Sequence, residues 1–142
     1  MISADTHLFI YAANPESSKH GAARSFFDTV QNDPTFVTCE LVLVEVYMQL
    51  RNPAVMRKPL DSKDAAAFCK TLRTHPVWQH VDYDKQVSGT LWTWAAATKS
   101  GFRRMIDARL ALTLLHHGIT DFATANVSDF QSFPFRRIWS PL

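Results

Sequence analysis

The sequence predicts an α/β fold: a three-layer α/β/α sandwich around a central, mostly parallel sheet of four to five strands. Short apolar runs typical of buried strands alternate along the chain with segments whose apolar residues recur at helical spacing. Only four glycines and seven prolines interrupt the 142 residues, and no repeat or linker-like stretch divides them. We therefore expect one domain, residues 1–142.

The opening residues predict a strand, two helices and a second strand. Residues 1–4 form a short apolar run typical of a buried strand, and Asp5 follows as a turn residue and N-cap. A helix over 7–13 ends at an Asn-Pro pair, because proline disfavours helical geometry in the residue before it. An apolar stripe predicts a second helix over 17–31, and Phe-Val-Thr at 36–38 predicts the second strand.

The segment LVLVEVYMQL, residues 41–50, is apolar at nearly every position. Periodicity alone does not separate a buried strand from a buried helix in such a run. Its length favours a helix, which the following Arg-Asn-Pro ends. Glu45 would then lie in the middle of a buried helix.

The second half of the chain continues the alternation of helices and strands. Asp61 or Ser62 caps the first of its helices. Ser100 and Gly101 separate the last two helices, and Gly118 caps the end of the final one. The predicted elements are a helix over 63–74, a strand over 77–81, helices over 85–98 and 103–117, a strand over 121–124 and a possible strand over 137–139.

Composition argues against several classes of protein. No apolar run approaches the roughly 20 residues of a membrane helix, and the start of the chain lacks the basic region of a secretory signal. Cys39 and Cys69 form neither a disulfide framework nor a zinc-ligand spacing, so we expect a cytoplasmic protein. A formal charge of +2 is too small to indicate a nucleic-acid binder by bulk charge alone.

Two carboxylates stand at positions that favour a functional role. Asp5 directly follows the first strand, and ligands bind at the carboxyl edge of open parallel sheets, although an N-cap explains it equally well. Glu45 has only apolar or uncharged neighbours within four positions. An ionised carboxylate on a buried helix is costly unless it is paired or binds a metal. A solvent-facing stripe is the alternative, but Leu41 would share that stripe.

Further carboxylates follow in the last third of the chain. Asp107 lies in an apolar helix, where Arg103 and Arg104 offer a surface ion pair or, alternatively, contacts to a phosphate backbone. Asp129 and Asn126 follow the fourth strand, and a simple turn explains each of them taken alone. Their common place near strand ends nevertheless predicts one cluster of acids.

A cluster of acids requires a countercharge, because like charges within about 4–6 Å raise each other's pKa. Mg²⁺ or Mn²⁺ is the natural candidate, since both prefer oxygen ligands. Such ions activate water and stabilise the leaving oxygen in phosphodiester hydrolysis. The acids therefore predict a metal-dependent hydrolase.

The chain resembles the PIN-domain ribonucleases, and among them the VapC-type toxins of bacterial toxin–antitoxin pairs. The resemblance runs from end to end and rests on the motifs ADTHLFIYAAN, ELVLVEVY, RRMIDARLALTLLHHG and FATANVSDFQSFP. It implies a Mg²⁺ or Mn²⁺ site held by Asp5, Glu45, Asp107 and Asn126. The implied catalytic acids are Asp5, Glu45, Asp107 and Asp129.

Two positions depart from the pattern of this family. His7 stands where the family often has Asn or Ser, and Asn126 stands where it often has an acid. The lack of this carboxylate argues against a second metal ion but not against the first. Asp129 is placed to supply a carboxylate in its stead. Thr6 and Thr124 are expected to orient carboxylates or waters by hydrogen bonding.

The resemblance also implies a substrate and partners. A metal-activated water would attack an RNA phosphodiester, and an antitoxin would mask the activity by laying a helix along an apolar groove of the toxin, which is expected to be a homodimer. Four basic residues are candidates for RNA phosphate contacts: Lys99, Arg103, Arg104 and Arg109. Solvated helix charge explains each of them equally well.

Two alternatives belong to other functional classes. An inactive PIN scaffold would serve RNA binding or complex assembly, and Asn126 is the sequence feature that favours it. A haloacid-type phosphatase needs an aspartate where His7 stands, and a phospho-receiver needs paired acids that the chain lacks. We therefore expect an endoribonuclease, with the inactive scaffold as the alternative.

Overall fold

Five parallel strands form the centre of the molecule in the computed structural model, which describes all 142 residues. The strands are β1 (Ile2–Ala4), β2 (Phe36–Cys39), β3 (Gln79–Val81), β4 (Asp121–Ala123) and β5 (Arg137–Trp139). Their order in the sheet is β3-β2-β1-β4-β5, and every neighbouring pair is parallel. The predicted sheet is confirmed, including the possible fifth strand.

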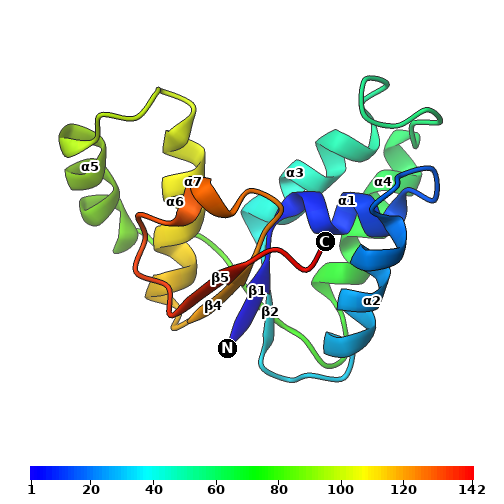
Figure 1. Cartoon of the computed structure of the whole chain (residues 1–142), viewed down its shortest axis with the longest axis horizontal. Helices are drawn as coiled ribbons and strands as arrows, with labels where there is room; N and C mark the ends of the chain where they lie inside the picture. The colour runs from blue at the N-terminus through cyan, green and yellow to red at the C-terminus, as the bar shows by residue number, and fades with distance from the viewer.

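Seven helices cover the two faces of the sheet (Figure 1). They are α1 (Thr6–Ala13), α2 (His20–Val30), α3 (Glu40–Leu50), α4 (Ser62–Arg73), α5 (Val87–Ala97), α6 (Arg104–His116) and α7 (Val127–Phe130). Helices α1 to α4 pack together on one face, where α1 contacts α2 and α3, and α3 contacts α4. Helices α5, α6 and α7 lie on the other face, which completes the predicted three layers.

The core lies between the sheet and these two helical layers. Phe36 on β2 and Phe122 on β4 are fully buried, as are Val46 on α3 and Leu114 on α6. Truncating a buried phenylalanine of this kind to alanine costs about 3–5 kcal/mol. The apolar run over 41–50 forms helix α3, as predicted, and its buried face belongs to this core.

Apart from shifts of one or two residues at element ends, two local features differ from the prediction. Helix α2 begins at His20 rather than at residue 17, because the side chains of Asn14 and Ser17 accept hydrogen bonds from backbone N–H groups two residues ahead and stabilise turns there. Helix α7 is absent from the prediction, since four residues are too few to produce a periodic pattern.

The end of α6 matches the prediction for its glycine. Gly118 has a φ of +81°, which side-chain-bearing residues rarely adopt, and its N–H donates to the carbonyl of Leu115. The chain turns there into β4. None of the helices has the length and apolar character required to cross a membrane.

Candidate active site

Asp5 lies at the carboxyl end of the central strand β1 and is almost completely buried. Its Oδ1 accepts a hydrogen bond of 2.8 Å from the backbone N–H of Thr6, so it caps α1. Its Oδ2 accepts a second bond of 2.8 Å from the Thr124 hydroxyl at the end of the neighbouring strand β4. Asp5 therefore serves as an N-cap and also presents a fixed carboxylate at the sheet edge.

Glu45 approaches the same edge from the middle of α3. Its side chain is half-buried, and its Oε2 accepts a bond of 2.6 Å from the Thr6 hydroxyl. Burial raises the pKa of Glu45, and the charges of Asp5 and Asp107 raise it further, while the bond from Thr6 opposes the shift. Glu45 thus lies near enough to Asp5 and Asp107 for both charges to act on it.

Asp107 belongs to the first turn of α6, on the opposite side of the sheet edge from α3. Burial raises the pKa of Asp107, and Asp129 and Asp5 raise it further, whereas Arg104 lowers it. The Arg104 Nε lies 3.3 Å from the Asp107 Oδ2. The surface ion pair offered by the sequence is therefore present, and it lies within the acidic cluster.

Arg104 also joins α6 to the short helix α7. Its guanidinium donates a bond of 2.9 Å to the Asp129 Oδ1 and contacts the backbone carbonyl of Asp129. Asn126 is the N-cap residue of α7, and its backbone N–H donates to the Thr124 hydroxyl over 3.0 Å. Asp129 and Asn126 therefore lie at the same edge as Asp5, with Arg104 as the countercharge of Asp129.

The sequence profile of the PIN domain family matches residues 2–135. The motifs that position these acids fall within that span. This chain belongs to the PIN domain family.

Named relatives agree with this assignment. The chain is 41% identical over 142 residues to Ribonuclease VapC24 of Mycobacterium tuberculosis, in both strains CDC 1551 and H37Rv, covering 100% of this chain and 97% of the relative. Its fold is similar to that of VapC20 from the same species, a sarcin–ricin loop cleaving toxin, with a TM-score of 0.67 at 19% identity over 86% of this chain and 87% of that one.

A second solved structure shares the fold over nearly the whole chain. VapBC2 from Rickettsia felis, bound to a DNA fragment from its promoter, has a TM-score of 0.64 at 16% identity over 99% of this chain and 98% of that one. At such low identities these likenesses establish the three-layer α/β/α fold of this PIN domain.

His7 is the residue at this site to which the prediction gave no role beyond its departure from the family pattern. Its Nδ1 lies 4.0 Å from the Asp5 Oδ2, and its side chain is 46% exposed. The carboxylate of Asp5 raises the pKa of His7, and Glu45 acts in the same direction against burial. Its place as the second residue of α1, two positions after the first acid, is the sequence signal that identifies it.

The four basic residues expected to contact RNA phosphates differ in their exposure and in whether they are paired with an acid. Lys99 and Arg103 are exposed, whereas Arg104 is engaged by Asp107 and Asp129. The Arg109 guanidinium lies 4.3 Å above the ring of Tyr83, and its Nε is buried without a partner. Lys99 and Arg103 are therefore the two of these four residues whose charges are exposed to solvent and form no ion pair with the acids.

The donor set of this PIN domain fits a hard divalent cation. Its candidate ligands are carboxylate oxygens, and their mutual repulsion contributes to the raised pKa values of Glu45 and Asp107. In this conformation no three His, Cys, Asp or Glu side chains lie close enough to hold one ion together. A bound cation would offset the repulsion between these carboxylates and allow them to lie closer together.

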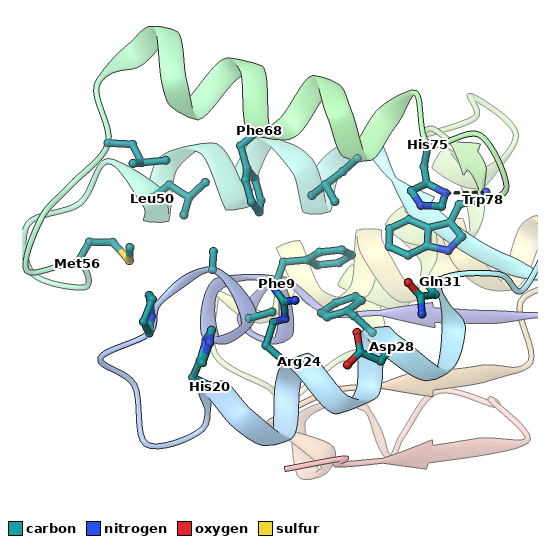
Figure 2. A pocket seen from close by; sticks show the side chains of 16 residues that line it. Phe9, His20, Arg24, Asp28, Gln31, Leu50, Met56, Phe68, His75 and Trp78 are labelled. Carbon is teal, nitrogen blue, oxygen red and sulfur yellow. Dashed lines mark hydrogen bonds between the residues drawn. The ribbon is translucent and has the colours of Figure 1, made fainter.

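An apolar cleft of about 580 Å³ lies within the layer of α1 to α4, between α1, α2 and α4 (Figure 2). Its apolar lining includes Phe9, Phe27, Leu50, Met56, Phe68 and Trp78. Arg24 and Asp28 of α2 are exposed on its rim. The cleft is thus a predominantly apolar surface with a charged border, separate from the acidic cluster.

Proposed function

We propose that this PIN domain is a metal-dependent endoribonuclease and the toxin of a toxin–antitoxin pair. The observation that carries the proposal is the approach of Asp5, Glu45 and Asp107 to one sheet edge, from a strand end and two separate helices. The full-length similarity to Ribonuclease VapC24 supports RNA as the substrate. Mg²⁺ or Mn²⁺ is the proposed cofactor.

Each residue has a distinct part in this mechanism. Asp5, Glu45 and Asp107 would hold the cation, with Asn126 or Asp129 completing the set. The ion, when bound, supplies positive charge for the phosphodiester and acidifies the attacking water. Asp5 is kept in orientation by the hydroxyl of Thr124, and Glu45 by that of Thr6.

The remaining groups bind the substrate. Lys99 and Arg103 would contact phosphates of the RNA backbone, because their charges are exposed. His7, whose pKa is raised by Asp5, adds positive charge beside the site when it is protonated. The chain itself therefore supplies orientation of the carboxylates and attraction for the RNA backbone.

Replacement of Asp5 by asparagine tests this function. Asp5→Asn keeps the cap geometry but removes the charge, so we expect RNA cleavage to fall by at least about a hundredfold. Cleavage would be followed on labelled RNA with Mn²⁺, with and without chelator. Asp64→Asn, which changes an exposed aspartate of α4, is the matched control and should cleave at the parent rate. Undiminished cleavage by Asp5→Asn would refute the assignment.

Asn126 favours one alternative, a PIN scaffold without chemistry. Titration with Mn²⁺ by calorimetry separates the two, because an active site needs a site for the ion that Glu45→Gln weakens. An inert scaffold would bind no Mn²⁺ tightly, and Glu45→Gln would then leave the titration unchanged.

We further propose that the apolar cleft receives a helix of the antitoxin. Its volume and apolar lining suit the apolar face of an amphipathic helix. Arg24 and Asp28 can pair with charged residues that border the apolar face of that helix. The chain is also proposed to act as a homodimer in the cytoplasm, where its two free cysteines, Cys39 and Cys69, would remain reduced.

A further inference from the structure

A hollow of about 330 Å³ lies between the end of α5 and the start of α6. Figure 1 shows the loop that joins these helices at the end of α6 that carries Asp107. The hollow is lined by Trp94 and Ala95 of α5, by Met105 of α6 and by the loop residues Thr98, Ser100, Gly101 and Phe102. Its volume falls at the lower end of the range for pockets that bind small ligands.

The lining combines flat apolar walls with a polar edge. Phe102 forms one wall and is 87% exposed, so it contributes little to the core. Trp94 forms another wall and is held by stacking on Phe133 at a centroid distance of 6.0 Å. The Thr98 hydroxyl accepts a bond of 3.1 Å from the backbone N–H of Ser100 at the polar edge. Flat faces with hydrogen-bonding groups at the edge suit a nucleobase.

Two positive charges belong to residues adjacent in sequence to the lining of the hollow. Lys99 and Arg103 are exposed, and the ion pairs at this end of the molecule are made by Arg104 instead. The Arg103 guanidinium lies 5.7 Å from the centroid of the Phe102 ring, an arrangement that keeps the cation and the aromatic face together. Cations beside an aromatic wall are the combination that single-stranded nucleic acids require.

The hollow is directly connected to the acidic cluster through the chain. Phe102 and Arg103 immediately precede Arg104, whose guanidinium contacts Asp107 and Asp129. The lining residue Met105 and the wall residue Phe102 thus lie within two positions of the arginine that contacts the acids.

We propose that this hollow binds an unstacked base of single-stranded RNA, with Phe102 as the stacking partner and Lys99 and Arg103 on the adjacent phosphates. The proposal rests on the proposed function, since it assigns a subsite to the same substrate. A second copy of the chain is a poorer occupant. A twofold contact centred on Phe102 would bring the Lys99 and Arg103 charges of both copies together.

The experiment measures RNA affinity without cleavage. In the Asp5→Asn background, fluorescence anisotropy would follow binding of a short labelled single-stranded RNA of mixed sequence and of its duplex. We expect Phe102→Ala to weaken single-strand binding about tenfold, the scale of one lost stacking contact, and to leave duplex binding unchanged. Phe102→Trp should retain parent affinity. Trp92→Ala removes a similarly exposed aromatic residue outside the hollow and is the matched control.

Two outcomes would overturn the proposal. One is equal single-strand affinity for Phe102→Ala and its parent. The other is dissociation of an oligomer by Phe102→Ala, seen by light scattering, with unchanged RNA affinity per chain, which would assign the hollow to a second copy. Unfolding temperatures confirm that each variant folds.

These failures are distinct from failure of the proposed function. If the unmodified protein cleaves RNA but Phe102→Ala in the Asp5→Asn background binds single strands normally, the base site is wrong and the nuclease assignment stands. If the unmodified protein does not cleave RNA while Phe102→Ala still weakens binding, the base site stands without the chemistry.

Discussion

At the scale of single residues, Glu45 shows how a functional carboxylate burdens the fold. Burial disfavours its charged form, so its folded pKa lies above the usual value of 4.5. In the unfolded chain the carboxyl loses its proton more easily. The contribution of this group to stability is therefore present at low pH and is lost as pH rises above about 4.5.

We accordingly expect Glu45→Gln to stabilise the metal-free protein at pH 7.5. The amide keeps an acceptor for Thr6 but carries no charge, so the variant should have the higher free energy of unfolding there, and the difference should vanish near pH 4. Urea unfolding in the presence of chelator at both pH values measures this. Glu16→Gln, at an exposed glutamate, should show no such pH-dependent gain. A parent as stable as Glu45→Gln at pH 7.5 would contradict the electrostatic explanation.

Arg104 partly neutralises the same cluster, and its removal should have two opposite effects. Arg104→Gln leaves Asp107 and Asp129 without their partner, so the metal-free protein should lose about 1 kcal/mol of stability. The same loss of positive charge should tighten Mn²⁺ binding roughly fivefold, measured by calorimetry.

Arg103→Gln is the matched control for that experiment, because Arg103 is adjacent in sequence but forms no ion pair with the acids. It should change the Mn²⁺ affinity far less. Weaker Mn²⁺ binding by Arg104→Gln would mean that the guanidinium orients the carboxylates for the ion rather than competing with it.

The sequence could predict Asp5, Glu45 and Asp107 as one group because the physics that unites them is simple. Parallel strands end at the same edge of the sheet, where ligands bind. An ionised carboxylate inside an apolar helix is costly unless it is paired or binds a metal. The contact between Arg104 and Asp129 could not be predicted, because 25 residues separate them and the orientation of α7 decides it. The aromatic hollow was likewise beyond prediction, since the loop geometry brings Trp94 and Phe102 to one cavity.

At the scale of secondary-structure elements, Glu40 joins four of them. As the first residue of α3, it accepts bonds from Arg73 at the end of α4 (2.9 Å) and from His80 on β3 (2.7 Å). The other ring nitrogen of His80 lies 2.9 Å from the hydroxyl of Thr38 on β2. This network fixes α3, and with it Glu45, against the edge of the sheet.

Glu40→Ala should therefore destabilise the protein more than an ordinary surface substitution. It leaves Arg73 and His80 without their acceptor, so we expect a loss of about 2 kcal/mol in the free energy of unfolding. Glu16→Ala removes a more exposed pair with Arg57 and should cost less than about 0.5 kcal/mol. Equal losses in urea unfolding would show that the Glu40 network is no stronger than a surface ion pair.

The order of elements was predictable from pattern, whereas their ends depended on side-chain hydrogen bonds. The length of its apolar run identifies α3 as a helix, and the pattern over 103–117 identifies α6. The start of α2 shifted because Ser17 stabilises a turn rather than capping a helix. Hydrophobic periodicity does not reveal whether a side-chain hydrogen bond in a turn or a backbone hydrogen bond in a helix forms at such a position.

At the scale of the whole molecule, a net charge of +2 hides a separation of charges. Acids gather at the carboxyl edge of the sheet, the exposed charges of Lys99 and Arg103 belong to the loop before α6, and the apolar cleft lies across α1, α2 and α4. Helix α1 belongs to both regions. The hydroxyl of Thr6, at its start, donates a hydrogen bond to Glu45, whereas Phe9, nearly one turn later, lines the cleft. An occupant of the cleft therefore contacts the helix whose first turn organises the acids.

This arrangement makes the cleft a testable route to inhibition. The protein encoded by a short reading frame directly upstream would be the antitoxin candidate, and its inhibition of RNA cleavage would be titrated. Arg24→Glu reverses a rim charge, so the partner concentration needed to halve each variant's own uninhibited rate should rise about tenfold. Lys63→Glu makes the same charge reversal on the exposed start of α4, outside the cleft lining, and should leave that concentration unchanged. Equal inhibition of Arg24→Glu and the parent would place the partner on another surface, since a helix seated in this cleft must pass the side chain of Arg24.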